Sequence, residues 1–172
     1  MTGEKERHNT QTEQQQAQNE SVGNATKDLF FKILKDGGAT CEELGDNRYG
    51  FFYKKEHFVV VIDESVIISI VDYNWHSVSR WDVETITELQ SKINHFNMYA
   101  MPKMVYAYDD DDDTFNISTM VTVPLMKEIG DVNTYFVAIL DRMIHAHEYI
   151  NGKSDDKDSA EQEEEEGGEK ND

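Results

Sequence analysis

The sequence predicts an α+β fold, an antiparallel sheet of about five strands flanked by three helices in the order α-β-β-β-α-β-β-α. Apolar residues recur at helical spacing in three separate segments, whereas two other regions alternate or run apolar as strands do. Turn-forming residues divide the first β region at short intervals. Such short intervals favour antiparallel hairpins over parallel crossover units.

Polar segments at both ends bound a single domain. Residues 1–24 hold almost no large apolar side chains, and residues 151–172 hold none. Such segments cannot bury enough apolar surface to offset their conformational entropy. We therefore expect a disordered N-terminal tail, an α+β domain at 25–150 and a disordered acidic C-terminal tail.

The first predicted element is a helix at about 25–36, which ends at two glycines. Strands are expected at 48–54, 57–63 and 66–73, with a short additional candidate at 40–44. The stretch FVVVI within the second of these is apolar at every position. Such a strand is either central with both faces covered, or covered on one face by another subunit. It therefore favours a homodimer.

A second helix is expected at about 80–96. Ser79 and Asp82 fit a capping box, and Val78 and Val83 could form the flanking hydrophobic staple. Two further strands then surround five consecutive aspartates and stop at a proline. A last helix is predicted at about 131–150, and its buried side would be Tyr135, Phe136, Ile139, Met143, Ile144, His147 and Ile150.

The chain carries a formal net charge of −19 and has a pI near 4.5. A surface this acidic repels nucleic acid and anionic lipid, because phosphate recognition needs a patch of lysine or arginine. We expect protein partners, basic ones first, and neither nucleic acid nor membrane. The single Cys41 excludes an internal disulfide, and no run reaches the ~18 apolar residues of a membrane span. A cytoplasmic location is expected.

The run Asp109–Asp113 invites a metal or catalytic interpretation. Calcium loops alternate their ligands and place a glycine at the sharp turn and a glutamate beyond it, and this run has neither. Aspartate favours turns by accepting hydrogen bonds from its own backbone, so a hairpin turn is the preferred interpretation. Weak divalent binding by this loop remains as the alternative.

Histidine and cysteine give little indication of chemistry. His145 and His147 are two residues apart on a helix and face different directions, so they cannot share a metal ion. His147 is expected in the core and His145 on the surface, with Glu148 in reach of His145. Cys41 has no nearby histidine or helix N-terminus that would make it a nucleophile.

Four stretches and the element order carry a resemblance to known proteins. The stretches are GFFYKKEHFVVVID, ISIVDYNWHSVSRWD, LQSKINHFN and KMVYAYDDDDDTFNIST. Together they resemble the type III secretion chaperone-like fold and, within it, the YbjN-type family of bacterial sensory transduction regulators. The resemblance covers about 25–150, and the polar tails lie outside it. It implies a small, acidic, often dimeric protein without enzymatic activity, and the secretion chaperones of this fold hold client segments in extended form.

These observations predict a non-enzymatic intracellular chaperone-like or adaptor module that buries a client's apolar segment on its strand and helix surface. No catalytic residue, cofactor or metal ligand is expected. The alternative is a ligand or divalent-metal sensing domain that uses Asp109–Asp113. Since interfaces favour aromatic side chains, the predicted partner or dimer surface consists of Phe58, Val60, Ile62, Trp75, Trp81, Tyr106 and Tyr108.

Overall fold

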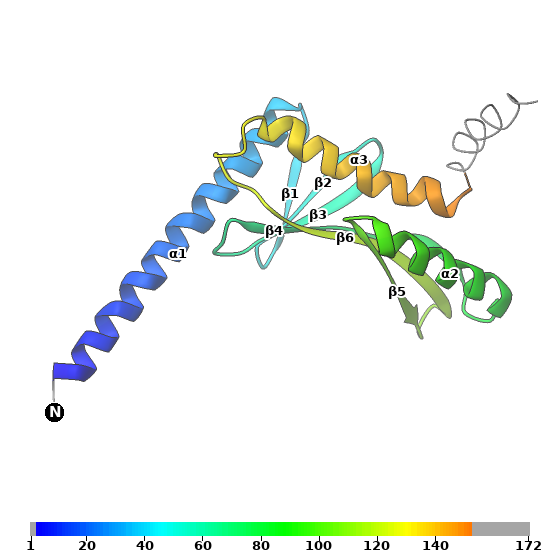
Figure 1. Ribbon diagram of the computed structural model, residues 1–172, viewed down its shortest axis with the longest axis horizontal. Coiled ribbons are helices and arrows are strands. Elements are labelled where there is room, and N and C mark those ends of the chain that lie inside the picture. The colour runs from blue at the N-terminus through cyan, green and yellow to red at the C-terminus, as the bar shows by residue number, and fades with distance from the viewer. Residues whose placement is uncertain (1–2, 153–172) are drawn as a thin grey trace, which may run out of the picture.

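The computed structural model describes the backbone of residues 3–152 and the side chains of residue 18 and residues 21–152 (Figure 1). Three helices and six strands follow one another in the order α-β-β-β-β-α-β-β-α, which confirms the predicted α+β class. The elements are α1 (Gly3–Asp36), β1 (Cys41–Gly45), β2 (Arg48–Tyr53), β3 (Glu56–Ile62), β4 (Ile67–Ser79), α2 (Val83–Tyr99), β5 (Lys103–Asp109), β6 (Thr114–Pro124) and α3 (Val132–Ile150).

All strands form one antiparallel sheet in the order β1-β2-β3-β4-β6-β5. The sheet has one strand more than the approximately five expected, because the short candidate at 40–44 does pair as β1. β4 is the longest strand and pairs with β6 on both sides of an irregularity between Asp72 and His76. On one side of this irregularity β4 contributes Ile68 and Ile70 to one part of the core, and on the other side Trp75 and Val78 pack against a second part.

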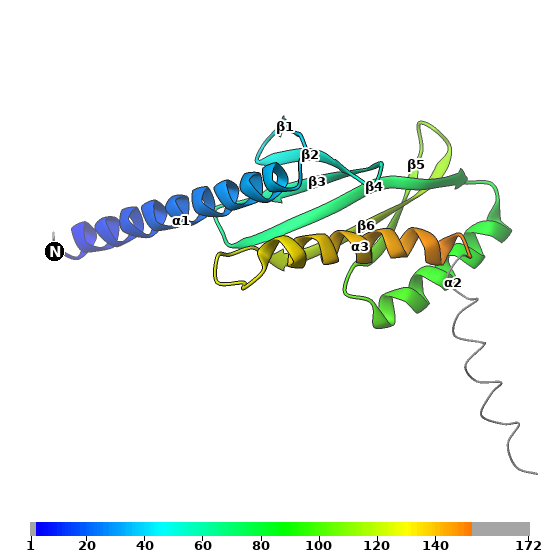
Figure 2. The same ribbon diagram turned by 90° about the horizontal axis from the view of Figure 1, so that it is seen from above.

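The helices cover one face of the sheet. In β6, Phe115 and Ile117 pack beneath α2, whereas Val121 and Val123 pack beneath α1 and α3. Alternate residues of a strand point to the same face, so all three helices lie on the same side. Figure 2 shows α2 and α3 together below the strands. The opposite face has no helix over it among the described residues.

Two apolar clusters form the core. The larger joins the apolar face of α1 and the first half of α3 to β2, β3, β4 and β6. Phe30 lies at its centre, with the rings of Phe51 and Phe136 edge-on to it at 5.8 and 6.0 Å between centroids. The smaller joins α2 and the end of α3 to the β5–β6 hairpin.

The central strand β3 corrects part of the predicted surface. Phe58, Val60 and Ile62 are buried in the larger cluster, so they belong to the core of one chain and are not available to a partner. Val59 points to the opposite face and is buried as well, in a strand that is paired on both sides. The apolar pattern of β3 therefore reflects an interior strand of a six-stranded sheet.

The start of α2 differs from the predicted capping box. Asp82 is the N-cap, and its carboxylate accepts hydrogen bonds from the backbone N–H of Thr85 at 3.1 Å and from its hydroxyl at 2.8 Å. Ser79 ends β4 and accepts a bond from the N–H of Trp81 instead. Val83 is exposed and forms no staple with the half-buried Val78. Aspartate caps as well as serine, and here it is the residue that adjoins the first turn.

The first helix is longer than the predicted 25–36 and begins at Gly3. Residues 3–24 extend α1 toward the N-terminus, in a segment where no regular structure is predicted. This segment contains glutamine, glutamate and lysine, which have high helix propensity and prolong the helix that packs on the sheet farther along the chain. The division into two tails and a 25–150 domain stays a prediction. The acidic C-terminal tail lies outside the described residues from position 153 onward. No helix in the described part of the chain is long and apolar enough to cross a membrane.

Candidate functional site

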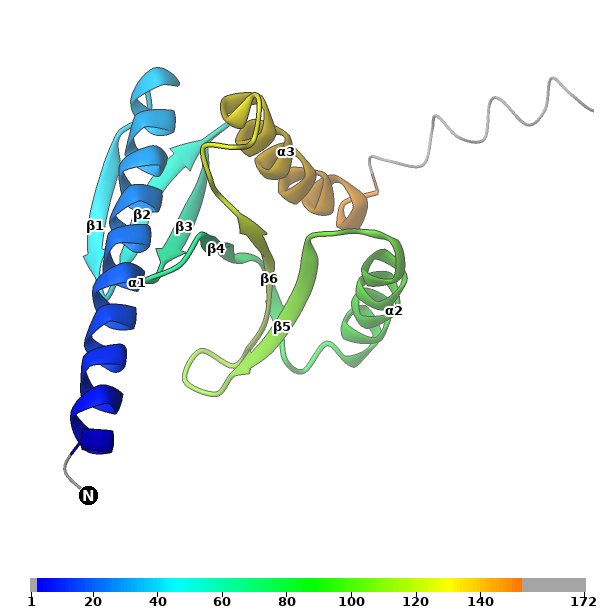
Figure 3. The same cartoon turned by 60° about the vertical axis from the view of Figure 1, so that its left-hand side comes forward.

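β5 is an outer strand of the sheet and pairs only with β6 (Figure 3). The side-chain amide of Asn97, on α2, receives a hydrogen bond from the backbone N–H of Met104 at 2.9 Å and donates one to its carbonyl at 2.8 Å. The backbone groups of Met104 therefore point away from β6. Antiparallel ladders alternate, so Tyr106 and Tyr108 also direct their backbone N–H and C=O groups outward.

These outward groups form a free β-edge. Among the described residues, no hydrogen bond beyond the sheet ladder reaches the backbone of Tyr106 or Tyr108. The middle of β5 reads MVYAY and carries no charge. Uncharged edge strands attract a further strand, which natural sheets usually prevent with charges, bulges or proline.

The other edge of the sheet is protected in this way. β1 reads CEELG, and its register shifts between Glu43 and Gly45. Glu42 and Glu43 place two carboxylates on a strand of five residues. β5 is therefore the edge that is better suited to receive another chain.

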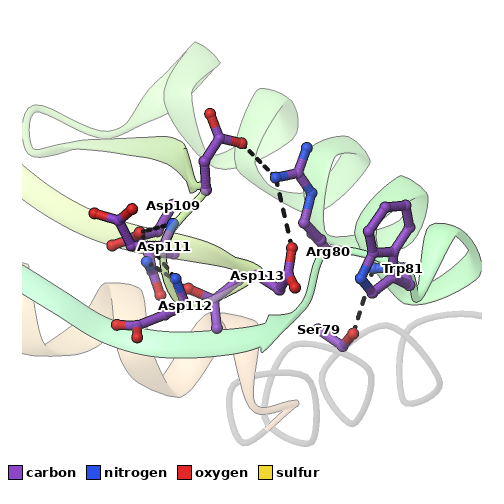
Figure 4. A network of polar contacts seen from close by, with 10 residues as sticks. Ser79, Arg80, Trp81, Asp109, Asp111, Asp112 and Asp113 are labelled. Atoms are coloured by element: carbon purple, nitrogen blue, oxygen red, sulfur yellow. Dashed lines mark hydrogen bonds and ion pairs between the residues drawn. The ribbon is translucent and has the colours of Figure 1, made fainter.

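The five aspartates form the turn between β5 and β6, as the sequence predicts (Figure 4). The Asp109 carboxylate accepts hydrogen bonds from the backbone N–H of Asp111 at 3.0 Å and of Asp112 at 3.3 Å. Asp113 has a φ of 53°, a left-handed conformation that aspartate tolerates better than most residues. The run is thus explained by turn formation.

Arg80 ties this turn to the end of β4 (Figure 4). Its guanidinium forms ion pairs with Asp110 and, at 3.8 Å, with Asp113, and its backbone N–H donates to the Asp113 carbonyl at 2.9 Å. The same guanidinium lies 5.3 Å from the ring centre of Trp81 and 6.0 Å from that of Tyr108. Arginine over aromatic rings is a favourable cation–π arrangement.

Three of the predicted surface residues come together here. Trp81 is 72% exposed, and Tyr106 and Tyr108 are about half exposed on β5. The two tyrosine rings rest on the buried Phe115, at 4.9 and 5.3 Å between centroids, which restrains them while one side faces solvent. We call Trp81, Tyr106, Tyr108 and the outward backbone of β5 the aromatic edge. That it binds a partner stays a prediction.

Trp75, the remaining predicted residue, lies elsewhere. It is half-buried, and its indole stacks on the imidazole of His147 with centroids 3.9 Å apart and an interplanar angle of 23°. Its indole N–H donates to the Thr119 hydroxyl at 2.9 Å. Trp75 is therefore a packing residue and not part of the aromatic edge.

His147 is buried, as predicted, but it also meets two carboxylates that the sequence analysis does not identify. Its Nε2 lies 3.0 Å from Oδ2 of Asp72, and its Nδ1 lies 4.0 Å from Oε1 of Glu56. The carboxylates come from β4 and from the start of β3. One signal was available: Asp72 shares the strand face of Ile68 and Ile70, which places a carboxylate at a core position.

The remaining candidates show no catalytic arrangement among the described residues. His145 pairs with Glu148 at 3.3 Å on the surface of α3. Cys41 is exposed on β1. Partial desolvation and the neighbouring Glu43 carboxylate raise the pKa of the Cys41 thiol, which disfavours the thiolate a nucleophile needs.

Comparisons with known proteins bear on the fold. No protein-family model matches the sequence, and no curated protein matches it. Among solved structures, the crystal structure of YbjN from E. coli, a candidate transcription regulator, is similar at a TM-score of 0.50 and 14% sequence identity. The match covers 78% of this chain and 92% of that chain. The chain therefore has a YbjN-type fold, whereas the resemblance to type III secretion chaperones stays a prediction.

Proposed function

We propose that this protein is a non-enzymatic adaptor or chaperone-like regulatory module that binds an extended segment of a protein client along β5. The observation that carries the proposal is the free, uncharged backbone edge at Tyr106 and Tyr108, which lies beside exposed aromatic rings. A client strand adds main-chain hydrogen bonds to such an edge, and its side chains contact the flanking surface.

The chemistry of the site indicates the chemistry of the client. Asp109 is occupied by the turn, and Arg80 pairs with Asp110 and Asp113. Asp111 and Asp112 remain without a cationic partner among the described ion pairs. We therefore infer that the client segment carries apolar side chains that contact the tyrosines and a lysine or arginine that faces Asp111 and Asp112. The net charge of −19 favours such a basic partner and keeps a complex in solution.

Two other expectations have less support. Metal sensing by the Asp109–Asp113 loop would have only two unbound carboxylates, because Asp109 is bound to the turn backbone and Arg80 pairs with Asp110 and Asp113. The homodimer expectation rested on the family resemblance and on β3, and the core-facing side chains of β3 are buried within one chain. A second copy pairing through β5 is an alternative occupant of the aromatic edge.

Affinity capture with matched variants tests the proposal. The full-length chain is immobilised, and partners are captured from an extract of the source organism and identified by mass spectrometry. The double variant Trp81→Ala/Tyr108→Ala should no longer capture the partner. Asp111→Asn/Asp112→Asn should weaken partner binding and make it less dependent on salt concentration. The control Phe52→Ala/Tyr73→Ala removes two exposed aromatic residues outside the aromatic edge and should retain it.

The same samples distinguish the occupants. Sedimentation of the purified chain shows whether it self-associates, and Trp81→Ala/Tyr108→Ala would abolish self-association if a second copy fills the edge. A partner that binds all variants equally, or no partner at all, would contradict the proposal.

A further inference from the structure

We propose that Glu56, Asp72 and His147 form a binding site for one transition-metal ion of the Zn²⁺ class. The site lies away from the acidic turn, and it does not depend on the proposed client binding. One potential ligand atom from each of the three residues lies within 4.8 Å of the other two. They come from the start of β3, from β4 and from α3, so the fold alone brings them together.

The donor atoms suit such an ion. Imidazole nitrogen and carboxylate oxygen bind Zn²⁺ at about 2.0–2.2 Å, which puts tetrahedral ligand atoms about 3.3 Å from one another. His147 Nε2 and Asp72 Oδ2 are already 3.0 Å apart. Glu56 Oε1 is 4.0 Å from Nδ1, the other nitrogen of the His147 ring. The Glu56 side chain is half-exposed, so it would turn inward to reach an ion held by Nε2. Water would complete the coordination.

A second observation points to a missing ligand. Asp72 is 2% exposed and His147 is 9% exposed, and Asp72 Oδ2 and His147 Nε2 have no hydrogen-bond partner. The two atoms approach one another at 3.0 Å but without the alignment of a hydrogen bond. Buried polar atoms that lack a hydrogen bond destabilise a fold. A cation bonded to both lone pairs would satisfy these atoms together.

The surroundings hold the ligands in place. The Trp75 indole covers one face of the His147 ring and is itself fixed by its bond to Thr119. Asp72 lies in an interior strand, between β3 and β6. Only Glu56 is substantially accessible, so an ion would enter from its side.

The ligand set also indicates which metals are excluded. Mg²⁺ and Ca²⁺ prefer oxygen ligands throughout, whereas imidazole favours Zn²⁺, Co²⁺, Ni²⁺ and Cu²⁺. The acidic turn and the glutamate-rich C-terminal segment offer oxygen ligands only. Excess Mg²⁺ should therefore occupy those carboxylates and leave the His147 site to the transition metal.

The structure offers its own reporter. The chain has two tryptophans, so Trp81→Phe leaves Trp75 as the only indole, stacked on the proposed ligand. Full-length Trp81→Phe is freed of metal with a chelator and titrated with Co²⁺ in excess Mg²⁺. We expect Trp75 fluorescence to be quenched with a stoichiometry of one ion per chain. ZnCl₂ should reverse the quenching and raise the Tm by several degrees.

Two variants in the same background assign the ligands. Glu56→Gln, at the half-exposed first residue of β3, tests the site without changing the core and should weaken Co²⁺ binding at least tenfold. His147→Gln should abolish quenching, and His145→Gln, two residues away on the same helix, should leave it unchanged. Absence of saturable quenching in the parent would overturn the proposal, as would equal binding by the parent, Glu56→Gln and His147→Gln.

Discussion

The indole of Trp75 lies nearly parallel to the imidazole of His147, with 3.9 Å between ring centroids. Trp75 packs against the smaller core cluster from β4, and His147 comes from α3, which contributes to both clusters. The stacked pair therefore lies where the two halves of the core meet, beside the irregularity that divides β4.

The Trp75 hydrogen bond and ring stack make separable contributions to stability. Trp75→Phe keeps an aromatic ring but removes the donor to Thr119, and we expect the free energy of unfolding to fall by about 1 kcal/mol. Trp75→Ala also removes the stack and should cost about 2–3 kcal/mol, less than a fully buried tryptophan. Urea denaturation measures both. Trp81→Ala, at an exposed position, should stay within about 0.5 kcal/mol of the parent, and equal losses at 75 and 81 would refute this account.

Gly23 tests the packing of α1 on the sheet. A Cβ at this position would lie 2.8 Å from Cα of Glu64 and 3.0 Å from the carbonyl oxygen of Asp63, in the turn after β3. In an unconstrained helix, glycine to alanine stabilises by about 1 kcal/mol. Here the contact is with backbone, so Gly23→Ala should destabilise by about 1–3 kcal/mol. The exposed Ser21→Ala is the control, and a stabilising Gly23→Ala would show that α1 does not rest on this turn.

The N-caps of α2 and α3 should make stability depend on pH in the acid range. Hydrogen bonds from the backbone and hydroxyl of Thr85 lower the pKa of Asp82, and those of Thr134 lower the pKa of Asp131. A carboxyl group whose folded pKa is depressed stabilises the fold above its unfolded pKa, about 3.9, and loses that contribution as pH falls through the folded value.

Replacing both caps with asparagine isolates this effect. Asparagine caps about as well as aspartate but does not titrate. Between about pH 5 and pH 2, the Tm of the parent should therefore fall more steeply than that of Asp82→Asn/Asp131→Asn. Thermal melts by circular dichroism measure both curves, and parallel curves would mean that the caps contribute nothing to the acid dependence.

We expect Asn97 to contribute more to the stability of the fold than a polar residue on a helix usually does. Its amide satisfies both backbone groups of Met104 on the outward side of β5. Asn97→Ala leaves these groups without their partner and should cost about 1–2 kcal/mol in urea denaturation. Asn94→Ala, at an exposed position of the same helix, should be neutral or slightly stabilising. Indistinguishable effects would show that the amide is not needed to hold α2 on β5.

Local patterns predict much of this fold. The apolar face of α1, the stripe of α2 and the DDDDD turn follow from residues within one element or hairpin, where periodicity and turn propensity act directly. The sequence overstated the surface role of Phe58, Val60 and Ile62, because an interior strand and an intersubunit strand have the same apolar pattern.

The contacts between residues far apart in the sequence do not follow from local patterns. Glu56, Asp72 and His147 belong to three elements, and their proximity depends on strand order and on how α3 crosses the sheet. The free edge at Tyr106 and Tyr108 likewise depends on β5 being outermost, which spacing does not determine. Of the predicted surface, Trp81, Tyr106 and Tyr108 remain exposed.

Site-specific photo-crosslinking tests the central claim, client binding along β5, most directly. A photoreactive phenylalanine analogue is placed at Tyr106 on the aromatic edge, or at Phe52, which is 65% exposed on the uncovered face of the sheet. Each full-length variant is irradiated in an extract of the source organism. Our account predicts that a client is crosslinked from position 106 and not from position 52. Crosslinking from position 52 alone would contradict it and place client binding on the open face of the sheet.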